Sequence, residues 1–394
     1  MMKRLAIALL ALGGLALGLV LVEALARAAS APNKSYMIPD PVLHHRLRPT
    51  MRRVVLGTEF ATNSLGLRDR EYPAAKPPGV RRLLMLGDSF TEGGGLLELG
   101  TVARQAEILI RDHCGRGWEV VNAGVASYSP ILEYLQLREI GWALSPDVVV
   151  LNFDMTDVHD DSVRTVFARL DARGLPVAVP SDRRAEAAFL MPPIGKPGWL
   201  AFLTPVERWL GRSKLYTELR ESRVGERLFG GVKLTPERLE ALGLVGDIRY
   251  DVDAITRDVE HPSEPAAWAL TARYLGAINA EARRRGVPFV VVVYPHAQQV
   301  SATASPEGRR RIGIGPGLYA SERPFRRLEA IGRREGFPVV SLLGLFRERE
   351  VSRGPLFRDD DIHHTEVGAY VFAEGIVAGL AGARVLECRH VLGR

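Results

Sequence analysis

The sequence is poor in cysteine, and the two that it contains stand far apart. Cys114 and Cys388 belong to no CxxC pair and to no Cys/His cluster with the spacing of metal ligands. We therefore expect no metal centre built on these thiols. The two residues could form one disulfide in an exported domain or remain separate thiols, and the sequence leaves that choice open.

Glycine-rich nucleotide-binding motifs are also missing. No G-x-G-x-x-G follows the first strand of the predicted sheet, and no P-loop pattern occurs. The formal net charge is +6, but the basic residues, nearly all arginine, are scattered and are not interleaved with aromatics. The sequence thus argues against a dinucleotide cofactor and against a nucleic-acid partner. We expect no cofactor and no metal.

One long apolar run is present, at the N-terminus. It covers residues 5–22 and follows Lys3 and Arg4. The run is long enough to cross a bilayer as a helix, and the cations before it predict a cytoplasmic N-terminus. We therefore expect residues 1–28 to anchor the chain in an inner membrane by a single pass, with the rest outside the cytoplasm. The alternative is a cleaved signal peptide and a secreted or periplasmic protein, with the small residues at 26–31 as the cleavage site.

The remaining chain divides into a lead-in, one large domain and a tail. Residues 29–80 contain recurring prolines and are expected to be an irregular segment that packs on the domain. Residues 81–385 alternate short apolar runs with helical patterns, which is typical of a parallel sheet covered on both faces. Within them, residues 160–265 read as a helical insertion, either over the site or without a role in it. Residues 386–394 form the tail.

We expect an α/β fold of the flavodoxin-like, three-layer α/β/α type, with a parallel sheet, the helical insertion and an N-terminal transmembrane helix. In such sheets the ligand site lies at the carboxyl ends of the strands. The expected strands are residues 82–87, 118–125, 147–153, 287–294 and 337–343, and the expected helices are residues 101–112, 131–144, 266–285, 324–334 and 365–381.

A candidate nucleophile follows the first strand, in Gly87-Asp88-Ser89-Phe90. Glycine allows a sharp turn there, and the serine reaches the carboxyl end of the strand. A serine attacks a carbonyl only when a neighbouring base activates it. Without such a partner, Ser89 would be read as the cap of the next helix.

A candidate base lies before the last predicted helix, in the run Asp359-Asp360-Asp361-Ile362-His363-His364. A carboxylate shortly before a histidine can bond its ring N–H and stabilise the imidazolium. A metal site is less favoured, because no second cluster of ligands matches this one. His296, after the fourth strand, could line the site, although a packed or solvated histidine is the commoner case. The remaining histidines, with no such setting, are His44, His45, His113, His159, His261 and His390.

Three blocks in order resemble the SGNH/GDSL hydrolase superfamily over roughly residues 81–385. They are Gly87-Asp88-Ser89-Phe90, the turn Asn122-Ala123-Gly124, and the Asp-x-x-His that ends at His363. The lead-in sequence at residues 62–68 (TNSLGLR) resembles a membrane-tethered bacterial subgroup of esterases and polysaccharide O-acetyltransferases.

The resemblance implies a role for each matching residue. Ser89 would be the nucleophile and would give one backbone N–H to the oxyanion. Gly124 would give a second N–H, and His363 would be the general base, with His364 pointing elsewhere. Asp360 would orient His363, with Asp361 as the close alternative.

The family has one more block, its third, which falls between the Asn122-Ala123-Gly124 turn and the Asp-x-x-His, and this third block departs from the family pattern here. Asp154-Met155-Thr156-Asp157 stands where the family has Gly-x-Asn-Asp, so Thr156 replaces an asparagine that donates to the oxyanion. Thr156 would be a weaker donor, or Asn152 would supply the amide, or the site is specialised or degraded.

The expected function is acyl transfer through a serine ester, on O-acetyl groups of cell-envelope or exported carbohydrate, with water or a sugar hydroxyl as the acceptor. The expected partners are an ester-bearing small molecule or carbohydrate and the membrane. The alternative is a non-catalytic envelope protein that binds glycan. A lipase acting on bilayer lipids is less favoured, because the insertion carries many charges.

Overall fold

The computed structural model describes residues 36–179 apart from residue 74, residues 261–389 apart from 312 and 313, residue 258, and a few positions between 13 and 23. Residues 36–179 and 261–389 belong to one compact unit. Most of the apolar run at 5–22, and the predicted insertion from residue 180 to 257, lie outside the described residues. Within the part that is described, no helix combines the length and the apolar character needed to span a membrane.

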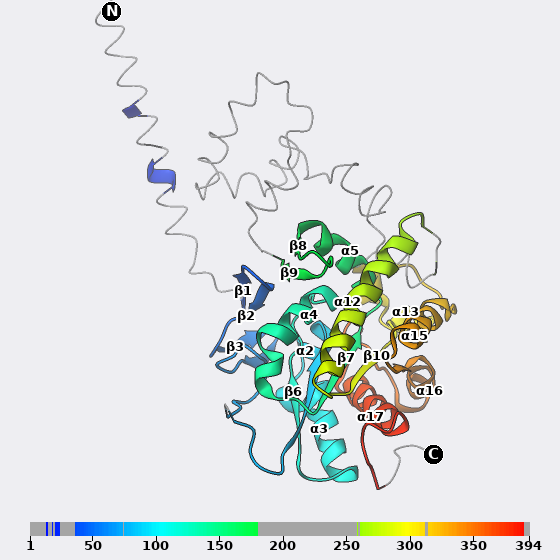
Figure 1. The fold of residues 1–394 in the computed structure, drawn as a ribbon. Helices are drawn as coiled ribbons and strands as arrows, with labels where there is room; N and C mark the ends of the chain where they lie inside the picture. The colour runs from blue at the N-terminus through cyan, green and yellow to red at the C-terminus, as the bar shows by residue number, and fades with distance from the viewer. Residues whose placement is uncertain are drawn as a thin grey trace, which may run out of the picture. The chain divides into compact units, whose positions relative to one another are not determined.

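A five-stranded parallel sheet forms the centre of the domain (Figure 1). Its strand order is β11-β10-β7-β5-β6. Numbered along the chain and read from the β6 edge, this order is 2-1-3-4-5. This is the order of flavodoxin-like doubly wound sheets, and the predicted parallel sheet is confirmed. The switch in winding direction lies between β5 and β7, so residues that follow these two strands meet at the carboxyl edge. The strands are β5 (Arg81–Leu86), β6 (Trp118–Asn122), β7 (Val148–Phe153), β10 (Phe289–Val293) and β11 (Val339–Ser341).

The strands are apolar on both faces, and helices cover each face. Leu83 and Met85 of β5 belong to one buried cluster with residues of α3 and α17, which pack on each other. Leu84 lies between these two residues in the strand and packs on the opposite face, where its side chain and that of Leu137 of α4 both lie close to Gly141. Successive strand residues point to opposite faces, so this alternation separates the two helical layers. The longer helices are α3 (Val102–His113), α4 (Pro130–Glu139), α5 (Asp157–Phe167), α12 (Glu264–Arg284), α15 (Arg323–Glu335), α16 (Leu343–Arg353) and α17 (Glu366–Gly382).

The lead-in is more regular than expected. It forms two antiparallel hairpins, β1 (Met37–Asp40) with β2 (His44–Leu47), and β3 (Arg52–Val55) with β4 (Thr58–Ala61). Leu56 and Gly57 make the two-residue turn of the second hairpin, both with positive φ, as a type I′ turn requires. The sequence Leu-Gly is a weak form of this turn signal, so the hairpin was not predicted.

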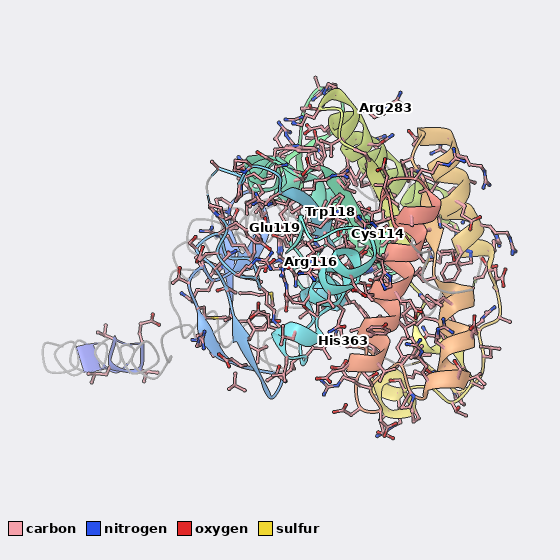
Figure 2. The ribbon with its side chains drawn as sticks, turned by 90° about the horizontal axis from the view of Figure 1, so that it is seen from below. Cys114, Arg116, Trp118, Glu119, Arg283 and His363 are labelled. Atoms are coloured by element: carbon pink, nitrogen blue, oxygen red, sulfur yellow. A yellow bond between two sulfur atoms is a disulfide. The ribbon has the colours of Figure 1, made fainter. Side chains whose placement is uncertain are left out.

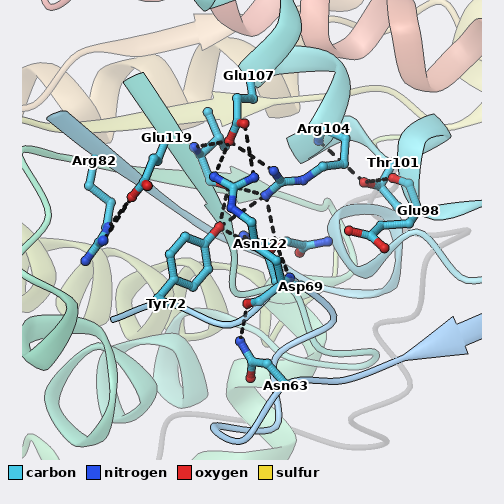
Figure 3. A network of polar contacts seen from close by, with 12 residues as sticks. Asn63, Asp69, Tyr72, Arg82, Glu98, Thr101, Arg104, Glu107, Glu119 and Asn122 are labelled. Carbon is cyan, nitrogen blue, oxygen red and sulfur yellow. Dashed lines mark hydrogen bonds and ion pairs between the residues drawn. The ribbon is translucent and has the colours of Figure 1, made fainter. Parts of the chain in front are cut away.

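Buried ion pairs tie the lead-in to the domain (Figure 3). Arg104 of α3 contacts Asp69 at 2.7 Å and Glu107 at 3.0 Å. Asp69 also accepts the N–H of Asn122 and the hydroxyl proton of Tyr72. Each buried charge therefore has a partner, which is the condition under which such a network stabilises a fold. The lead-in packs against α3 and β6 as part of the domain.

A disulfide closes the C-terminal end of the domain. Cys114, which caps α3 and is labelled in Figure 2, forms a disulfide with Cys388, which follows α17. The pairing that the sequence left open is therefore made in the structure. Beyond α5, the described residues form the two short strands β8 (Arg169–Leu170) and β9 (Pro176–Ala178) where helix was expected.

Candidate active site

Ser89 stands at the carboxyl end of β5, as the first residue of the short helix α2 (Ser89–Glu92). Gly87 makes the turn with a φ of 154°. A Cβ at Gly87 would lie 2.2 Å from the Thr91 hydroxyl oxygen, so only glycine fits. Asp88 caps the helix by accepting the Phe90 N–H at 3.0 Å. The serine side chain is half-buried.

Two hydrogen bonds connect Ser89 to a histidine and a carboxylate. His363, in the loop before α17, places Nε2 2.8 Å from Ser89 Oγ. Its other ring nitrogen, Nδ1, lies 2.8 Å from Asp361 Oδ1. The structure thus brings together two segments 274 residues apart. The position of His363 is labelled in Figure 2. A base within hydrogen-bond reach of the hydroxyl, itself oriented by a carboxylate, is the geometry of an activated serine.

Asp361, and not Asp360, is the residue that holds His363. Asp360 is largely exposed and lies 3.5 Å from Arg358, so the preference for an Asp-x-x-His spacing is wrong. Asp361 Oδ1 also lies 3.4 Å from the backbone N of His363, in the local turn that Asp favours two residues before its donor. The hydrogen bond from His363 lowers the pKa of Asp361 to about 2.

Two of the predicted oxyanion donors are committed to other partners. The Gly124 N–H donates to Asn122 Oδ1 at 3.0 Å, so it does not point to a substrate. A Cβ at Gly124 would lie 2.3 Å from the Glu92 backbone nitrogen, so this glycine allows the loop to pack on α2. The amide nitrogen of buried Asn152 donates to the Thr91 hydroxyl at 3.0 Å. In this structure the Gly124 N–H and one N–H of the Asn152 amide are therefore engaged by other partners.

Ser89 and Thr156 are predicted oxyanion donors that each have a hydrogen-bond donor not used within the described residues. Among the described residues, no acceptor takes the Ser89 N–H or the Thr156 hydroxyl. The backbone N–H of Thr156 donates to Asp154 Oδ1 at 2.9 Å. Thr156 therefore has one donor left, its short hydroxyl.

A set of buried polar side chains lies next to the nucleophile, and their meeting was not predicted from the sequence. The Tyr294 hydroxyl is 3.0 Å from Asp88 Oδ1 and 3.0 Å from Asp154 Oδ2. His296 Nε2 lies 2.6 Å from Asp154 Oδ1. The ring of Phe90 contacts the rings of both His296 and His363. The sequence feature that could have predicted this set is Asp154 in the third block, because a buried carboxylate needs a partner, and His296 is that partner.

A histidine of the lead-in reaches the loop beside α2. His45 Nε2 is 2.8 Å from the Ala126 carbonyl oxygen, and the Ala126 N–H donates to Glu92 at 2.7 Å. The Tyr128 hydroxyl donates to the His45 carbonyl at 2.6 Å. The loop after β6 is thus held from two sides, and one side is a histidine for which the sequence offered no setting.

His364 points away from Ser89 into a set of aromatic rings. It is fully buried beside Phe346, Phe357 and Phe372, and its ring nitrogens have no hydrogen-bond partner among the described residues. Burial lowers the pKa of His364 from 6.5 to about 3. The side chain is therefore neutral in the folded protein across that range.

We expect His364→Leu to make the protein less sensitive to acid. Between pH 6.5 and about 3 the unfolded chain binds a proton at His364 that the folded chain does not bind. Stability is therefore lost as the pH falls, by a few kcal/mol at most. Urea unfolding at several pH values should show the variant gaining relative to wild type on acidification. The control is His113→Gln, at a partly exposed position; a pH-independent difference between His364→Leu and wild type would contradict the prediction.

No metal site is evident: the described ranges contain no group of three or more His, Cys, Asp or Glu side chains arranged to hold an ion.

Comparison with known proteins finds similar solved structures but no sequence relative. No protein-family model and no curated protein matches the chain. An acetyl xylan esterase (AlAXEase) is 11% identical, with a TM-score of 0.35, covering 75% of this chain and 97% of its own. TesA is 12% identical, with a TM-score of 0.36 and coverages of 77% and 99%. A GDSL-like lipase from Bacteroides thetaiotaomicron is 12% identical, with a TM-score of 0.35 and coverages of 77% and 89%.

At these identities and TM-scores the chain is assigned to no family. Its function has to be inferred from the site itself.

Proposed function

We propose that this protein is a serine-dependent acyl-transfer enzyme that cleaves ester bonds. The observation that carries the proposal is the pair of 2.8 Å contacts that joins Ser89 Oγ to His363 and His363 to Asp361. These residues come from the end of a core strand and from a distant loop, so their meeting is not a local capping arrangement. An ordinary N-cap serine accepts a backbone N–H, whereas here the cap is Asp88.

The first half of the reaction forms an acyl-enzyme. His363 Nε2 takes the Ser89 proton as Oγ attacks the ester carbonyl carbon, and the carbonyl oxygen becomes an oxyanion. Asp361 keeps the imidazolium oriented and stabilises its charge. The oxyanion accepts a hydrogen bond from the Ser89 N–H. It accepts a second one from the Thr156 hydroxyl when the bound substrate places the oxyanion within reach of that group. Collapse of the intermediate breaks the bond to the alcohol, which leaves with the proton from His363.

The second half removes the acyl group from Ser89. His363 takes a proton from the acceptor, water or a sugar hydroxyl, which attacks the ester carbonyl carbon. Collapse breaks the bond to Oγ, and the proton returns to Ser89. With water the protein is an esterase, and with a sugar hydroxyl it is an O-acyltransferase.

We propose O-acetyl groups of cell-envelope or exported carbohydrate as the substrate, with the domain outside the cytoplasm. Two features support this location. The apolar run at residues 5–22 follows Lys3 and Arg4, which favours export of the domain on its C-terminal side. The Cys114–Cys388 disulfide is of a kind that persists in oxidising compartments.

A second candidate is a protein that binds glycan without turning it over. The observation that favours it is that two predicted oxyanion donors are engaged elsewhere: the Gly124 N–H bonds to Asn122, and one N–H of the Asn152 amide bonds to Thr91. Removing one donor from an oxyanion hole costs roughly 10²–10³ in rate.

A fluorophosphonate probe separates the two candidates. An activated Ser89 should form a phosphonyl ester that peptide mapping finds at this residue, and Ser89→Ala should remain unlabelled while keeping its circular dichroism and melting transition. His363→Ala should label far more slowly, because the hydroxyl loses its base. A folded wild-type protein that does not label would favour the glycan-binding protein, and labelling that persists in Ser89→Ala would contradict the assignment of the nucleophile.

A further inference from the structure

Asp154 stands where the resemblance leads one to expect glycine, and the structure gives this aspartate a complete set of partners. Its Oδ1 accepts the Thr156 N–H at 2.9 Å and lies 2.6 Å from His296 Nε2. Its Oδ2 lies 3.0 Å from the Tyr294 hydroxyl. The side chains of Asp154 and His296 are only 2% and 1% exposed. A buried carboxylate with this many donors is suited to carry a full negative charge.

The tautomer of His296 follows from its own contacts. His296 caps α13 (Ala297–Val300), where its backbone N–H donates to Gln299 Oε1 at 2.9 Å. A carboxylate oxygen can only accept, so the 2.6 Å contact with Asp154 Oδ1 places a hydrogen on Nε2 of the ring. His296 therefore donates to Asp154.

Counting protons around Tyr294 shows that one of its two carboxyl neighbours is protonated. The hydroxyl has a single proton but lies 3.0 Å from both Asp88 Oδ1 and Asp154 Oδ2. With two carboxylates, one of these contacts would be a repulsion between an oxygen lone pair and a buried negative charge. Two carboxyl groups that share one buried site cannot both ionise.

Asp88 is the carboxyl that holds the proton. Apart from the Tyr294 hydroxyl, which both carboxyl groups contact, Asp88 accepts only the Phe90 N–H, whereas Asp154 accepts the Thr156 N–H and contacts His296 Nε2. Burial and then the charge of Asp154 raise the pKa of Asp88 well above its usual range. Burial alone would raise the pKa of Asp154 as well, but the attraction and hydrogen bond of His296 outweigh it and leave that pKa below its usual range.

The position of the proton matters because Asp88 directly precedes the nucleophile and caps α2. A charged Asp88 would repel the oxyanion that forms beside the Ser89 N–H, whereas a neutral Asp88 would not. We propose that Tyr294, Asp154 and His296 are positioning residues for the acyl-transfer site: they hold the buried negative charge on Asp154 and the shared proton on Asp88, and so keep the residue next to Ser89 neutral and its helix cap in place. The role in catalysis rests on the proposed function; the protonation pattern does not.

Other ionisable groups face this set. Asp157 accepts the Asp154 N–H at 3.1 Å, and burial raises the pKa of Asp157 well above its usual range. Glu133 of α4 is fully buried, and its pKa is also raised, by burial and then by Asp161. The ring of His364 packs against that of Tyr294, with centroids 5.8 Å apart, and the ring of His363 packs against Phe90. None of these groups donates to Asp88, so the shared proton is governed by Tyr294 and Asp154.

The first test replaces Asp154 by asparagine and follows kcat for p-nitrophenyl acetate against pH. Without the charge at position 154, Asp88 should lose its proton at a lower pH, and kcat should gain a fall with rising pH that wild type lacks over the same range. The double variant Asp154→Asn/Asp88→Asn should lose that fall, since an asparagine at the cap position still accepts the backbone N–H and cannot ionise. A uniform loss at every pH, or a fall that persists in the double variant, would overturn the proposal.

The second test uses a matched pair of buried tyrosines. Tyr294→Phe should lower kcat roughly tenfold with KM unchanged, the effect of about one lost hydrogen bond to a charged group. Tyr274→Phe removes a buried hydroxyl that contacts Thr165 Oγ1 at 2.6 Å and should cost stability without this loss. Equal effects of the two substitutions on kcat would mean that Tyr294 has a structural role alone.

A third readout does not need activity. Carboxyl ¹³C NMR should assign a protonated side chain to Asp88 near neutral pH in wild type and an ionised one in Asp154→Asn. An ionised Asp88 in wild type would reject the protonation pattern itself. If the NMR result holds and the wild-type protein does not turn over ester or label with fluorophosphonate, the proposed function fails while the charge arrangement stands.

Discussion

Asp361→Asn is expected to lower kcat by about 10⁴ while KM changes little. Asp361 Oδ1 lies 2.8 Å from His363 Nδ1, and a carboxylate there can only accept, so Nδ1 carries the hydrogen and Nε2 is free to take the Ser89 proton. An asparagine can turn its NH₂ toward Nδ1, which then accepts and leaves the hydrogen on Nε2, the wrong nitrogen. Steady-state kinetics with p-nitrophenyl acetate, and the rate of fluorophosphonate labelling, would measure the loss.

Asp360→Asn is the matched control. Asp360 is the adjacent residue, is largely exposed and contacts Arg358 at 3.5 Å, so its loss should change kcat by less than about twofold. The two substitutions remove the same charge from neighbouring positions, and only their geometry differs. If Asp360→Asn were the more damaging of the two, His363 would take its partner from the Asp-x-x-His spacing after all.

Cys388→Ser is expected to lower the free energy of unfolding by up to about 5 kcal/mol. The Cys114–Cys388 bond joins residues 274 positions apart, and the loop entropy that a disulfide removes from the unfolded chain grows with the logarithm of loop length. Loss of this bond restores that entropy, while α3 and α17 still pack on each other. Urea unfolding of wild type and variant, compared by midpoint and slope, would measure the change.

Wild-type protein unfolded with a reducing agent is the control for the missing bond. Its midpoint should move to that of Cys388→Ser, and reductant should leave the variant unchanged. Ser89 should still label with fluorophosphonate in the folded variant, because the bond lies at the end of α3 away from the loop that carries His363. A midpoint that reductant does not move would mean that the two thiols are not joined in solution.

The local pattern of apolar residues predicts the central strands and several of the helices. The continuous apolar runs at 82–87 and 147–153 became β5 and β7, because a strand buried on both faces needs apolar residues at every position. The helices expected at 266–285 and 324–334 match α12 and α15 within about two residues at each end. Such runs carry enough local information to be read without knowledge of their neighbours.

Local pattern does not predict the short strands of the lead-in or those that follow α5. Each hairpin strand there has only about four residues, and its ladder exists because the other strand is present. The pairing of Leu43 with Val179 joins two segments that no sequence window contains. A strand this short has little preference of its own, so partners decide its conformation.

The order of residues along the chain specifies which residue types stand at the ends of the strands: a serine after β5, an aspartate after β7, a tyrosine and histidine after β10, and a histidine with three aspartates before α17. Which of these residues meet depends on the fold. The choice of Asp361 over Asp360, the capture of the Gly124 N–H by Asn122, and the pairing of Asp154 with His296 each depend on side-chain directions within a few ångströms. Hydrogen bonds form only at such distances, and residue spacing along a loop does not specify them.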